Sequence, residues 1–463
     1  MPTADFSALA DVPLRVERPT RIPAARYYDE EFFRLETERL WPKVWQLACR
    51  LEEIPELGDW VEYKILDKSV IVVRTGDGVR AFHNACRHRG VRLAHEQGNC
   101  AAHGFVCPFH GWRWNMDGQN TFVFGRTKFA EADLDPADIA LVPCRVELWG
   151  GCAFINFDAE APPLLDCLGA GAERMSARGV GELRLEWWKS SVLPVNWKLA
   201  MEAFMEGYHV MATHPQLHAV TAPEMRAYGQ DHPGDDTPPA SASAREFLEV
   251  SIRHLAKLSE GMGGMVHPRE VAIAQALHDM ELPDEVGPAM MAFYTRLRDE
   301  ITVQGRAQGM PVPDLNQLAA EHPFKAVEYF FPNYFLLPMF SAMIGYRIRP
   351  LEAESCLFEI FSLAFVPPDE QRETPSAPVP TSHDDPSYPE IPRQDYSNLP
   401  QQQLGLHAQG FEFMRLCPEM EGMISNYQRL IDGYLAGLDH ATLAAGAARA
   451  SGGFDAPVVD IGF

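Results

Sequence analysis

The chain has 463 residues, of which 46% are hydrophobic and 22% charged, and its formal net charge is −24. This length exceeds one ordinary core, so we expect two domains, and no apolar run is long enough to cross a bilayer. The negative charge argues against nucleic-acid binding, because phosphate recognition needs a basic face. The N-terminal residues show neither a signal-peptide nor a twin-arginine pattern, so we expect a cytoplasmic protein.

The first third of the chain indicates one helix followed by short strands. Residues 28–45 form an amphipathic pattern broken near Pro42. From about 58 to 158, alternating and β-branched runs are separated by turn residues, with Asp77-Gly78 at a hairpin. We therefore expect a small all-β domain whose loops are held rigidly.

Two short motifs of the same type lie in these loops. A Cys-Arg-His triplet begins at residue 86, and Cys-Pro-Phe-His begins at 107 after 18 intervening residues. A Rieske [2Fe–2S] centre has two Cys on one iron and two His on the other, so the pair predicts Cys86, His88, Cys107 and His110 as ligands. Structural zinc is the alternative, but zinc fingers group their two Cys together and their two His together. The other seven cysteines are expected to be reduced core residues.

The rest of the chain mixes helices and strands. Residues 244–320 are mostly helical in pattern, and strand-like segments follow at 326–339, 343–349 and 356–366. Residues 367–392 carry eight prolines and indicate a long surface loop. A final helix is expected over 400–437.

A second set of metal-binding residue types lies in the segment NWKLAMEAFMEGYHVMATHP, residues 196–215. Glu202, Glu206 and His209 recur at steps of four and three, so a helix places them on one face. His214 precedes a proline, which disfavours the α conformation and lets it reach back from beyond the helix end. Two imidazoles and a carboxylate form the facial triad of non-haem Fe(II) oxygenases. Taken alone, the same residues fit the solvated face of an exposed helix, but a Rieske centre favours the metal site because mononuclear iron needs its electrons.

Together the motifs resemble the large (α) subunit of the Rieske non-haem iron oxygenases that hydroxylate aromatic rings. The matching pieces are CRHRG at 86–90, CPFHGW at 107–112 and the stretch 196–214. The resemblance implies an α+β fold, in which an all-β Rieske domain precedes a catalytic domain with an antiparallel sheet surrounded by helices (helix-grip).

The resemblance also suggests the domain bounds. We expect residues 1–45 to be a helical segment packing on the catalytic domain, 46–160 to be the Rieske domain and 161–463 to be the catalytic domain. A longer stretch than is usual in the family predicts a helical insertion at about 235–320, and we hypothesise that it caps the substrate pocket.

By this resemblance, His209 and His214 bind a mononuclear Fe(II). Glu206 corresponds to the carboxylate that links one subunit's Rieske histidines to the next subunit's iron. The third ligand in the family is an Asp ahead of a Gln-x-Gly-Leu piece, and Asp395 ahead of residues 403–406 fits that pattern. The competing aspartates nearby in sequence are Asp384, Asp385 and Asp432.

Two positions depart from the usual family pattern. Ala203 stands where the family usually has Asn, so any role of that amide is absent or met by another group. Glu206 stands in place of the more frequent Asp, which resembles the quaternary-amine and related monooxygenase-like branches.

The substrate is less clearly encoded. Aromatic and methionine side chains suggest an apolar, aromatic or polycyclic ligand, although most such residues are ordinary core. The candidate pocket residues are Phe204, Met205, Met211, Phe331, Tyr334, Phe335, Met343 and Phe361.

The implied activity is hydroxylation, cis-dihydroxylation or oxidative demethylation with O2. Electrons from NAD(P)H reach the chain through a separate reductase, with or without a ferredoxin, because no GxGxxG motif follows a strand here. The family implies a homotrimer or a multiple of it, and a small β subunit stays open. A Rieske electron carrier is the alternative, but it leaves the C-terminal three hundred residues unexplained; a scaffold with a relic cluster is disfavoured by the intact His209, His214 and Asp395.

Overall fold

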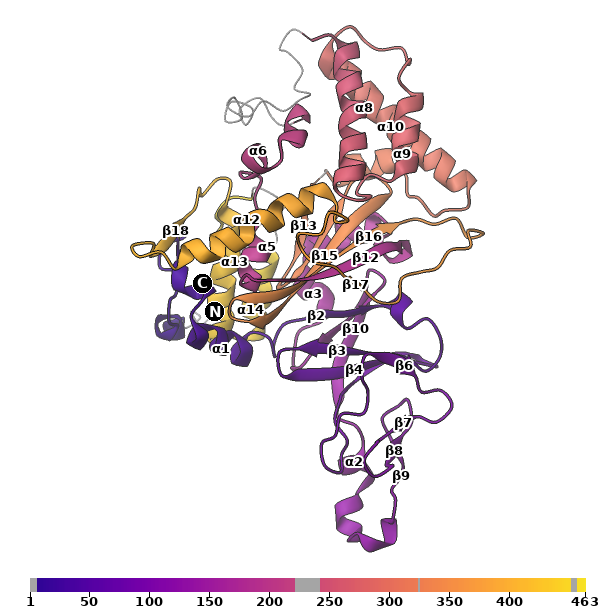
Figure 1. The fold of residues 1–463 in the computed structure, drawn as a ribbon, viewed down its shortest axis with the longest axis vertical. Coiled ribbons are helices and arrows are strands. Elements are labelled where there is room, and N and C mark those ends of the chain that lie inside the picture. Colours follow the sequence, from indigo (N-terminus) through magenta and orange to yellow (C-terminus); the bar gives the residue numbers. More distant parts are fainter. Residues whose placement is uncertain (1–5, 221–241, 324, 451–455) are drawn as a thin grey trace. The chain divides into compact units, whose positions relative to one another are not determined.

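The computed structural model describes residues 6–220, 242–323, 325–450 and 456–463 (Figure 1). The chain forms two compact units. One contains residues 36–167, and the other joins the residues up to Leu35 to those from Leu168 onward. The N-terminal stretch thus belongs to the same unit as the C-terminal part.

The unit of residues 36–167 is built from two β-sheets. Its seven-stranded sheet has the order β2-β11-β10-β5-β4-β3-β6, and its three-stranded sheet has the order β7-β8-β9. The predicted hairpin is confirmed, since β4 and β5 are antiparallel with Thr75 opposite Gly78. The strands of the first sheet are β2 (Gln46–Arg50), β3 (Asp59–Ile65), β4 (Lys68–Thr75), β5 (Gly78–His83), β6 (Gln97–Asn99), β10 (Pro143–Trp149) and β11 (Cys152–Asn156). Those of the second are β7 (Phe105–Val106), β8 (Arg113–Trp114) and β9 (Asn120–Phe122), with the short helix α2 (Pro136–Ile139) after them.

The larger unit contains a six-stranded sheet of order β13-β14-β15-β16-β12-β17. Adjacent strands in this sheet run antiparallel, except that β12 and β17 are parallel. A small pair joins β1 (Arg21–Pro23) to β18 (Phe413–Arg415). The sheet strands are β12 (Arg184–Leu193), β13 (Glu328–Phe330), β14 (Tyr334–Pro338), β15 (Ala342–Glu352), β16 (Ser355–Ala364) and β17 (Val379–Pro380).

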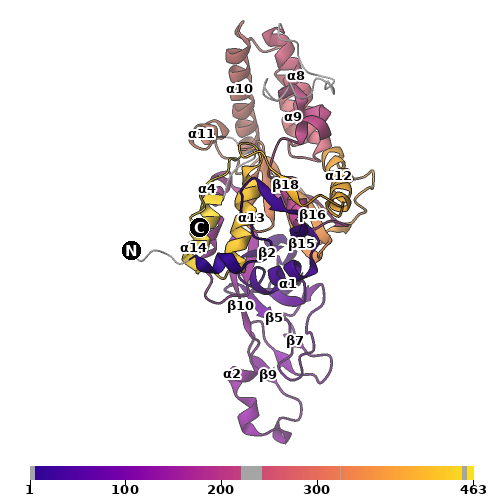
Figure 2. The ribbon, with the colours of Figure 1, turned by 90° about the vertical axis from the view of Figure 1, so that its left-hand side faces the viewer.

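The helices of the larger unit fall into two groups, one outside the predicted insertion and one within it. The first group is α4 (Ala170–Ala177), α5 (Trp197–Glu202), α6 (Val210–Thr213), α12 (Glu390–Leu406), α13 (Gly422–Leu435) and α14 (His440–Ala450), of which α5 contacts β15 and β16. The insertion holds α8 (Ala244–Gly261), α9 (Pro268–Ala276), α10 (Val286–Ala307) and α11 (Leu315–Glu321). Figure 2 shows α8 and α10 as long neighbouring helices, and α8 also contacts the 3₁₀ helix η7 (Pro215–Val220). Two further helices, α1 (Glu30–Arg39) and α3 (Leu164–Leu168), lie at the boundaries of the units. No described helix has the length and apolar character needed to cross a membrane.

The predicted final helix over 400–437 is wrong. It is two helices, α12 and α13, separated by β18. Gly410 with φ of 88° and Pro418 lie between them, and both residues disfavour a continuous helix. The backbone of this segment instead pairs with β1, where Met414 lies opposite Ile22.

The two faces of the six-stranded sheet carry different side chains, because successive residues of a strand point to opposite sides. We call the first the iron-helix face, since Phe204, just after α5, packs there against Phe335, Tyr346 and Phe358 at ring-centroid distances of 5.9, 4.6 and 5.8 Å. The opposite face carries Trp188, whose ring lies 6.4 Å from that of Phe361.

The opposite face also holds a buried ion pair. Arg347 donates to both carboxylate oxygens of Glu359, at 2.7 and 2.8 Å, and Arg349 lies 3.2 Å away. Burial alone raises the pKa of Glu359, but the two guanidinium groups lower it on balance. The carboxylate therefore remains ionised in the core of the sheet.

Glu359→Ala is expected to lower the free energy of unfolding by about 3–5 kcal/mol, because the buried guanidinium group of Arg347 and the partly buried one of Arg349 lose their counter-charge. Denaturant unfolding measures the change. Glu352→Ala, at an exposed position of β15, is the control and is expected to stay within about 0.5 kcal/mol of the parent. Equal stability of the two variants would contradict this role of the pair.

Candidate metal centres

The two Cys/His motifs of the smaller unit form loops of the same geometry. In the first, the N–H of Gly90 donates to the carbonyl of Cys86 at 2.9 Å, and in the second Gly111 donates to Cys107 at 2.9 Å. Both glycines have positive φ, 77° and 69°, a conformation that glycine adopts without strain. Two matching loops therefore present their side chains in the same way.

The side chains of these loops fit a [2Fe–2S] cluster. Cys86 and Cys107 are buried, and the rings of His88 and His110 lie 4.7 Å apart. The Nδ1 atoms of both histidines are buried and have no hydrogen-bond partner among the described residues. A buried nitrogen without a partner costs about 1–3 kcal/mol, and a bound iron removes that cost. Burial, and then the neighbouring Cys107, raise the pKa of Cys86, so bound iron also explains how the Cys86 sulfur becomes a thiolate.

Surrounding aromatic side chains fix these ligands. The ring of His88 stacks on Trp112 at 4.9 Å with an angle of 8°, and Phe129 packs edge-on against both. The loops are therefore held by packing as well as by backbone hydrogen bonds.

The segment with the second donor set is not the single helix that the sequence predicts. α5 begins at the N-cap Asn196, whose side chain accepts from the N–H of Lys198 at 2.9 Å, and it ends at Glu202. Residues 203–208 form turns, and α6 starts after His209. The helix is interrupted because the Glu206 carboxylate accepts from the N–H of His209 at 3.0 Å, so a side chain replaces a helical carbonyl.

His214 lies where its proline neighbour leads us to expect it. It follows α6 with φ of −124° and ψ of 69°, outside the helical region. Its side chain is 2% exposed and faces Asp395 on α12, which begins far downstream in the sequence.

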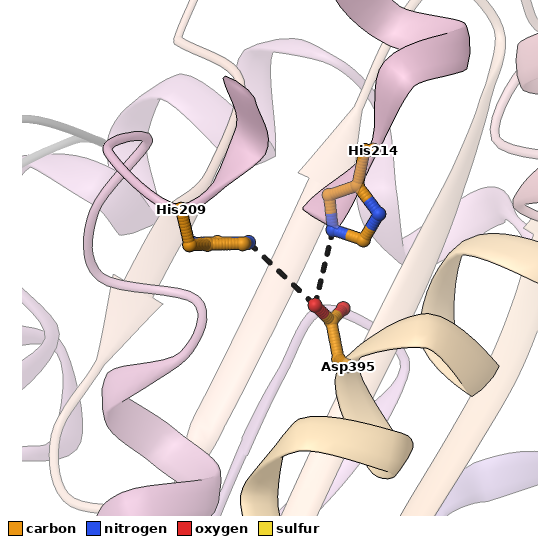
Figure 3. A group of neighbouring side chains, drawn as sticks. All are labelled: His209, His214 and Asp395. Carbon is orange, nitrogen blue, oxygen red and sulfur yellow. Dashed lines mark ion pairs between the residues drawn. The ribbon is translucent and has the colours of Figure 1, made fainter. Parts of the chain in front are cut away.

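His209, His214 and Asp395 converge (Figure 3). The Nε2 atom of His214 lies 3.0 Å from Oδ1 of Asp395, and Nε2 of His209 lies 3.6 Å from the same oxygen. One donor atom from each residue lies within 4.8 Å of the other two. Two imidazoles and one carboxylate in this arrangement suit a ferrous ion with open positions on one side.

Each histidine of this triad is oriented through its other ring nitrogen. The Nδ1 atom of His209 lies 2.8 Å from Oε1 of Glu206, and Nδ1 of His214 lies 2.7 Å from Oε1 of Gln394. Acceptors at Nδ1 put the proton there and leave Nε2 unprotonated for a metal. The sequence gives Gln394 no metal-ligand character, and only its place beside Asp395 could have drawn attention to it.

The competing aspartates lie elsewhere. Asp384 is exposed, and Asp432 is bound to Arg26 at 2.6 Å. Of the candidates weighed from the sequence, Asp395 is the one that meets the two histidines.

A cavity of about 490 Å³ opens beside the triad. Its lining includes His209 and Asp395, the carboxylates Glu202 and Glu206, and Ala203. It extends to the exposed residues Gln402 and Arg415. The methyl group of Ala203 lies where the family usually has an amide, so Glu202 and Glu206 are the polar groups of α5 and the following turn that face this space.

None of the seven pocket candidates whose side chains the structure describes lines this cavity. Phe204 and Phe335 lie on the iron-helix face, but Tyr334, Met343 and Phe361 lie on the opposite face because the strands alternate. The Phe331 ring instead stacks on Tyr434 at 5.3 Å. Met205 is fully buried, and the Met211 side chain lies outside the described part of the chain.

Glu202 has a raised pKa. It is fully buried, and burial raises its pKa to about 7 despite hydrogen bonds from Gln428 and Tyr27. Tyr27 comes from the N-terminal 3₁₀ helix η2 (Ala24–Tyr27), 175 residues earlier, so no local pattern reveals this contact.

Two donor sets of this kind on an α+β chain define a protein with a Rieske cluster and a separate mononuclear iron site. A family model described as "Ring hydroxylating alpha subunit (catalytic domain)" matches residues 176–437, and one described as "Rieske [2Fe-2S] domain" matches residues 44–123. The chain therefore belongs to the family of ring-hydroxylating oxygenase α subunits, as its motifs led us to expect.

Several proteins of this family are similar to the chain over part of its length. It is 35% identical over 197 residues to the carnitine monooxygenase oxygenase subunit of Escherichia coli (strain K12), covering 42% of this chain and 52% of that one. It is 34% identical over 213 residues to the glycine betaine monooxygenase oxygenase subunit of Pseudomonas aeruginosa, covering 45% and 48%. The corresponding values for the biphenyl 2,3-dioxygenase α subunit of Rhodococcus jostii are 32% over 225 residues, with 47% of each chain covered. The chain spans about half the length of the curated relatives it matches.

Solved structures confirm the predicted fold class. Naphthalene 1,2-dioxygenase with indole bound has a TM-score of 0.62 at 22% identity, covering 93% of this chain and 95% of that one. A quaternary ammonium Rieske monooxygenase in complex with L-carnitine has a TM-score of 0.58 at 18% identity, covering 91% and 97%.

Cys107→Ala is expected to abolish the visible absorption of the iron-loaded protein and the EPR signal of its reduced form, because one iron of the cluster loses a ligand. Iron per chain should fall from about three atoms to about one, the mononuclear ion alone. Cys144→Ala is a matched control, since Cys144 is buried in β10 of the same unit, and it should keep both signals. A coloured Cys107→Ala protein would show that the cluster is held elsewhere.

Asp395→Ala is expected to reduce iron from about three atoms per chain to about two while the cluster spectrum stays unchanged. The triad loses its only carboxylate, so the two imidazoles alone hold the ion weakly. Metal analysis after dialysis measures the loss, and Asp384→Ala, at an exposed position, serves as control. Full iron retention in Asp395→Ala would exclude this residue as a ligand.

Glu202 is expected to make stability fall as pH rises. Its folded-state pKa of about 7 is above the ordinary 4.5, so between these values the unfolded chain releases a proton that the folded chain retains. Its contribution is absent below pH 4.5 and reaches about 3 kcal/mol of destabilisation above pH 7. Unfolding at pH 5 and 8 should show a smaller pH dependence in Glu202→Gln than in the parent; the same dependence in both would contradict the shift.

Proposed function

We propose that the chain is the oxygenase component of a Rieske non-haem iron oxygenase system. It would use O2, and electrons that a separate NAD(P)H-dependent reductase supplies directly or through a ferredoxin. The observation that carries this proposal is the convergence of His209, His214 and Asp395 in a chain that also holds the Cys86, His88, Cys107 and His110 set. An electron carrier needs only the four cluster ligands, and the triad therefore argues against that alternative.

The chain's own residues prepare both sites for this chemistry. When bound, the cluster supplies single electrons and the ferrous ion supplies the means to activate oxygen. Glu206 and Gln394 hold the ring protons of His209 and His214 at Nδ1, which fixes both rings. The same Glu206 carboxylate lines the cavity, so it is positioned to accept a hydrogen bond from a group that enters this space.

Glu206 is our candidate for the contact between electron donor and triad. We propose that a Rieske histidine of a neighbouring subunit hydrogen-bonds to its carboxylate, within a homotrimer or a multiple of it, with or without a small β subunit. Its bond to His209 leaves carboxylate lone pairs for this second contact. We further propose that the protein acts in the cytoplasm, where NAD(P)H is available to the reductase.

Two substrate classes compete. The apolar side chains that line the cavity, among them Leu199, Leu399, Phe411 and Met414, support an apolar or aromatic substrate. The ring of Phe411 also suits a quaternary ammonium group, which is attracted to aromatic faces. Relatives named for carnitine, glycine betaine and biphenyl include both classes.

The test is NADH-dependent oxygen uptake with a surrogate reductase and a panel of glycine betaine, L-carnitine, naphthalene and biphenyl. We expect at least one compound to stimulate uptake and to yield an oxygenated or demethylated product, and Asp395→Ala to abolish that product while the cluster is still reduced. Hydroxylated rings would favour the aromatic class, and aldehyde or amine products the ammonium class. Reduction of the cluster without product from any compound would favour the carrier.

A further inference from the structure

One of the carboxylates that line the cavity beside the triad is not explained by the metal site. Glu202 is the last residue of α5 and lines the same space as Glu206, His209 and Asp395. It is only 5% exposed, so the cavity is its route of contact with water.

The groups that hold Glu202 are uncharged. The hydroxyl of Tyr27 lies 2.9 Å from both carboxylate oxygens, and the amide of Gln428 donates to Oε1. The same amide donates to the Tyr27 hydroxyl at 3.1 Å. This network can hold the carboxyl group in either protonation state, because the hydroxyl and a carboxyl proton can rotate to exchange donor and acceptor roles.

Arg26, whose charge favours the ionised form of Glu202, is already paired with another carboxylate. Arg26 donates through Nε to the side-chain oxygen of Gln428 at 2.8 Å and forms an ion pair with Asp432 at 2.6 Å. By comparison, Glu359 in the sheet is held ionised by two arginines. Glu202 is thus a buried carboxyl group without a direct arginine partner, and it faces a cavity.

Other charged or titratable groups surround it on several elements. Lys198 and Arg26 favour the ionised carboxylate, and burial opposes it. Burial raises the pKa of Tyr329, and the neighbouring Tyr434 and Glu202 raise it further. Burial also raises the pKa of Glu421, and the neighbouring Glu206 acts in the same direction. The titratable groups that act on Glu202 or line its cavity are Arg26, Tyr27, Lys198, Glu206, His209, Tyr329, Asp395, Arg415 and Glu421.

The proposed reaction needs protons at this place. Insertion of one oxygen atom follows the balance substrate–H + O2 + 2 electrons + 2 H⁺ → substrate–OH + H2O, with the electrons coming from NAD(P)H through the reductase. A carbon–hydrogen bond becomes a carbon–oxygen bond, and the second oxygen atom leaves as water. The protons must reach the triad, which lies beside a cavity that extends to the exposed residues Gln402 and Arg415.

We propose that Glu202, together with the Tyr27 hydroxyl, delivers protons to the triad through the shared cavity. The carboxyl group releases its proton to water in the cavity, which passes it to the oxygen atom that leaves as water. Glu202 then regains a proton from solvent at the end of the cavity near Gln402 and Arg415. The inference rests on the proposed oxygenase function, and it makes Glu202 a proton-delivery residue that acts through water. Its pKa of about 7 suits this role, because both protonation states are populated near neutrality.

The first test observes Glu202 directly. Infrared spectra of the iron-loaded protein, recorded as a function of pH, should contain a protonated carboxyl band that disappears as pH rises through about 7. Glu202→Gln should lack it, and Glu270→Gln should keep it. Glu270 is a matched control because it is fully buried with a raised pKa and bonds to the Ser341 hydroxyl at 2.6 Å, but it does not line this cavity. If no band depends on Glu202, the inference is wrong.

The second test compares pH profiles of product formation. The parent rate should fall as pH rises through 7, since less Glu202 is protonated. Glu202→Gln should be at least about tenfold slower with a flatter profile. Tyr27→Phe removes a hydrogen bond that lowers the pKa of Glu202, so its profile should move to higher pH.

Melting temperature and iron content identify variants that fail for structural reasons, and Tyr27→Phe keeps the test decisive if Glu202→Gln does not fold. Normal rate and profile in folded Glu202→Gln, or an unshifted profile in Tyr27→Phe, would overturn proton delivery while leaving the oxygenase proposal intact. Absence of turnover in the parent with every substrate would instead contradict the oxygenase proposal, and the inference would fall with it.

Discussion

The iron site depends on how two imidazole rings are held from behind. A histidine can offer Nε2 to a metal only when its proton resides on Nδ1, and an acceptor at Nδ1 both places that proton and fixes the ring. Glu206 provides this acceptor for His209 and Gln394 provides it for His214. The interruption between α5 and α6 follows from the same requirement, because Glu206 must turn back to reach both the backbone N–H and the ring of His209.

α12 supplies the remaining parts of the site as a unit. Gln394 and Asp395 are neighbours on this helix, so one element delivers both the carboxylate that meets the two Nε2 atoms and the amide that orients His214. Further along, the amide oxygen of Gln403 accepts from the N–H of Asn196 at 2.8 Å, which fastens α12 to the start of α5. Contacts near both ends of α12 therefore fix the helix that carries Asp395 relative to the segment that carries the two histidines.

Local sequence predicted those parts of the protein whose residues are neighbours in the chain. The cluster motifs, the hairpin at Asp77-Gly78 and the displacement of His214 by its following proline are of this kind. Asp395 could be chosen only by resemblance, since nothing near it in sequence shows that α12 meets His214. The single helix expected for Glu202, Glu206 and His209 was wrong because periodicity does not reveal a side chain that caps the backbone. Candidate pocket residues such as Tyr334 and Phe361 had the right chemistry, but strand alternation puts them on the other face of the sheet.

The arrangement requires that His209 and His214 present Nε2, together with an Asp395 oxygen, to one isolated iron. Anomalous diffraction at the iron edge, from crystals grown anaerobically with ferrous salt, locates that ion. We expect an isolated peak within bonding distance of those three atoms, with Glu206 and Gln394 still at the Nδ1 atoms. A peak bound through Nδ1, a peak at other aspartates or no isolated peak at all would contradict it.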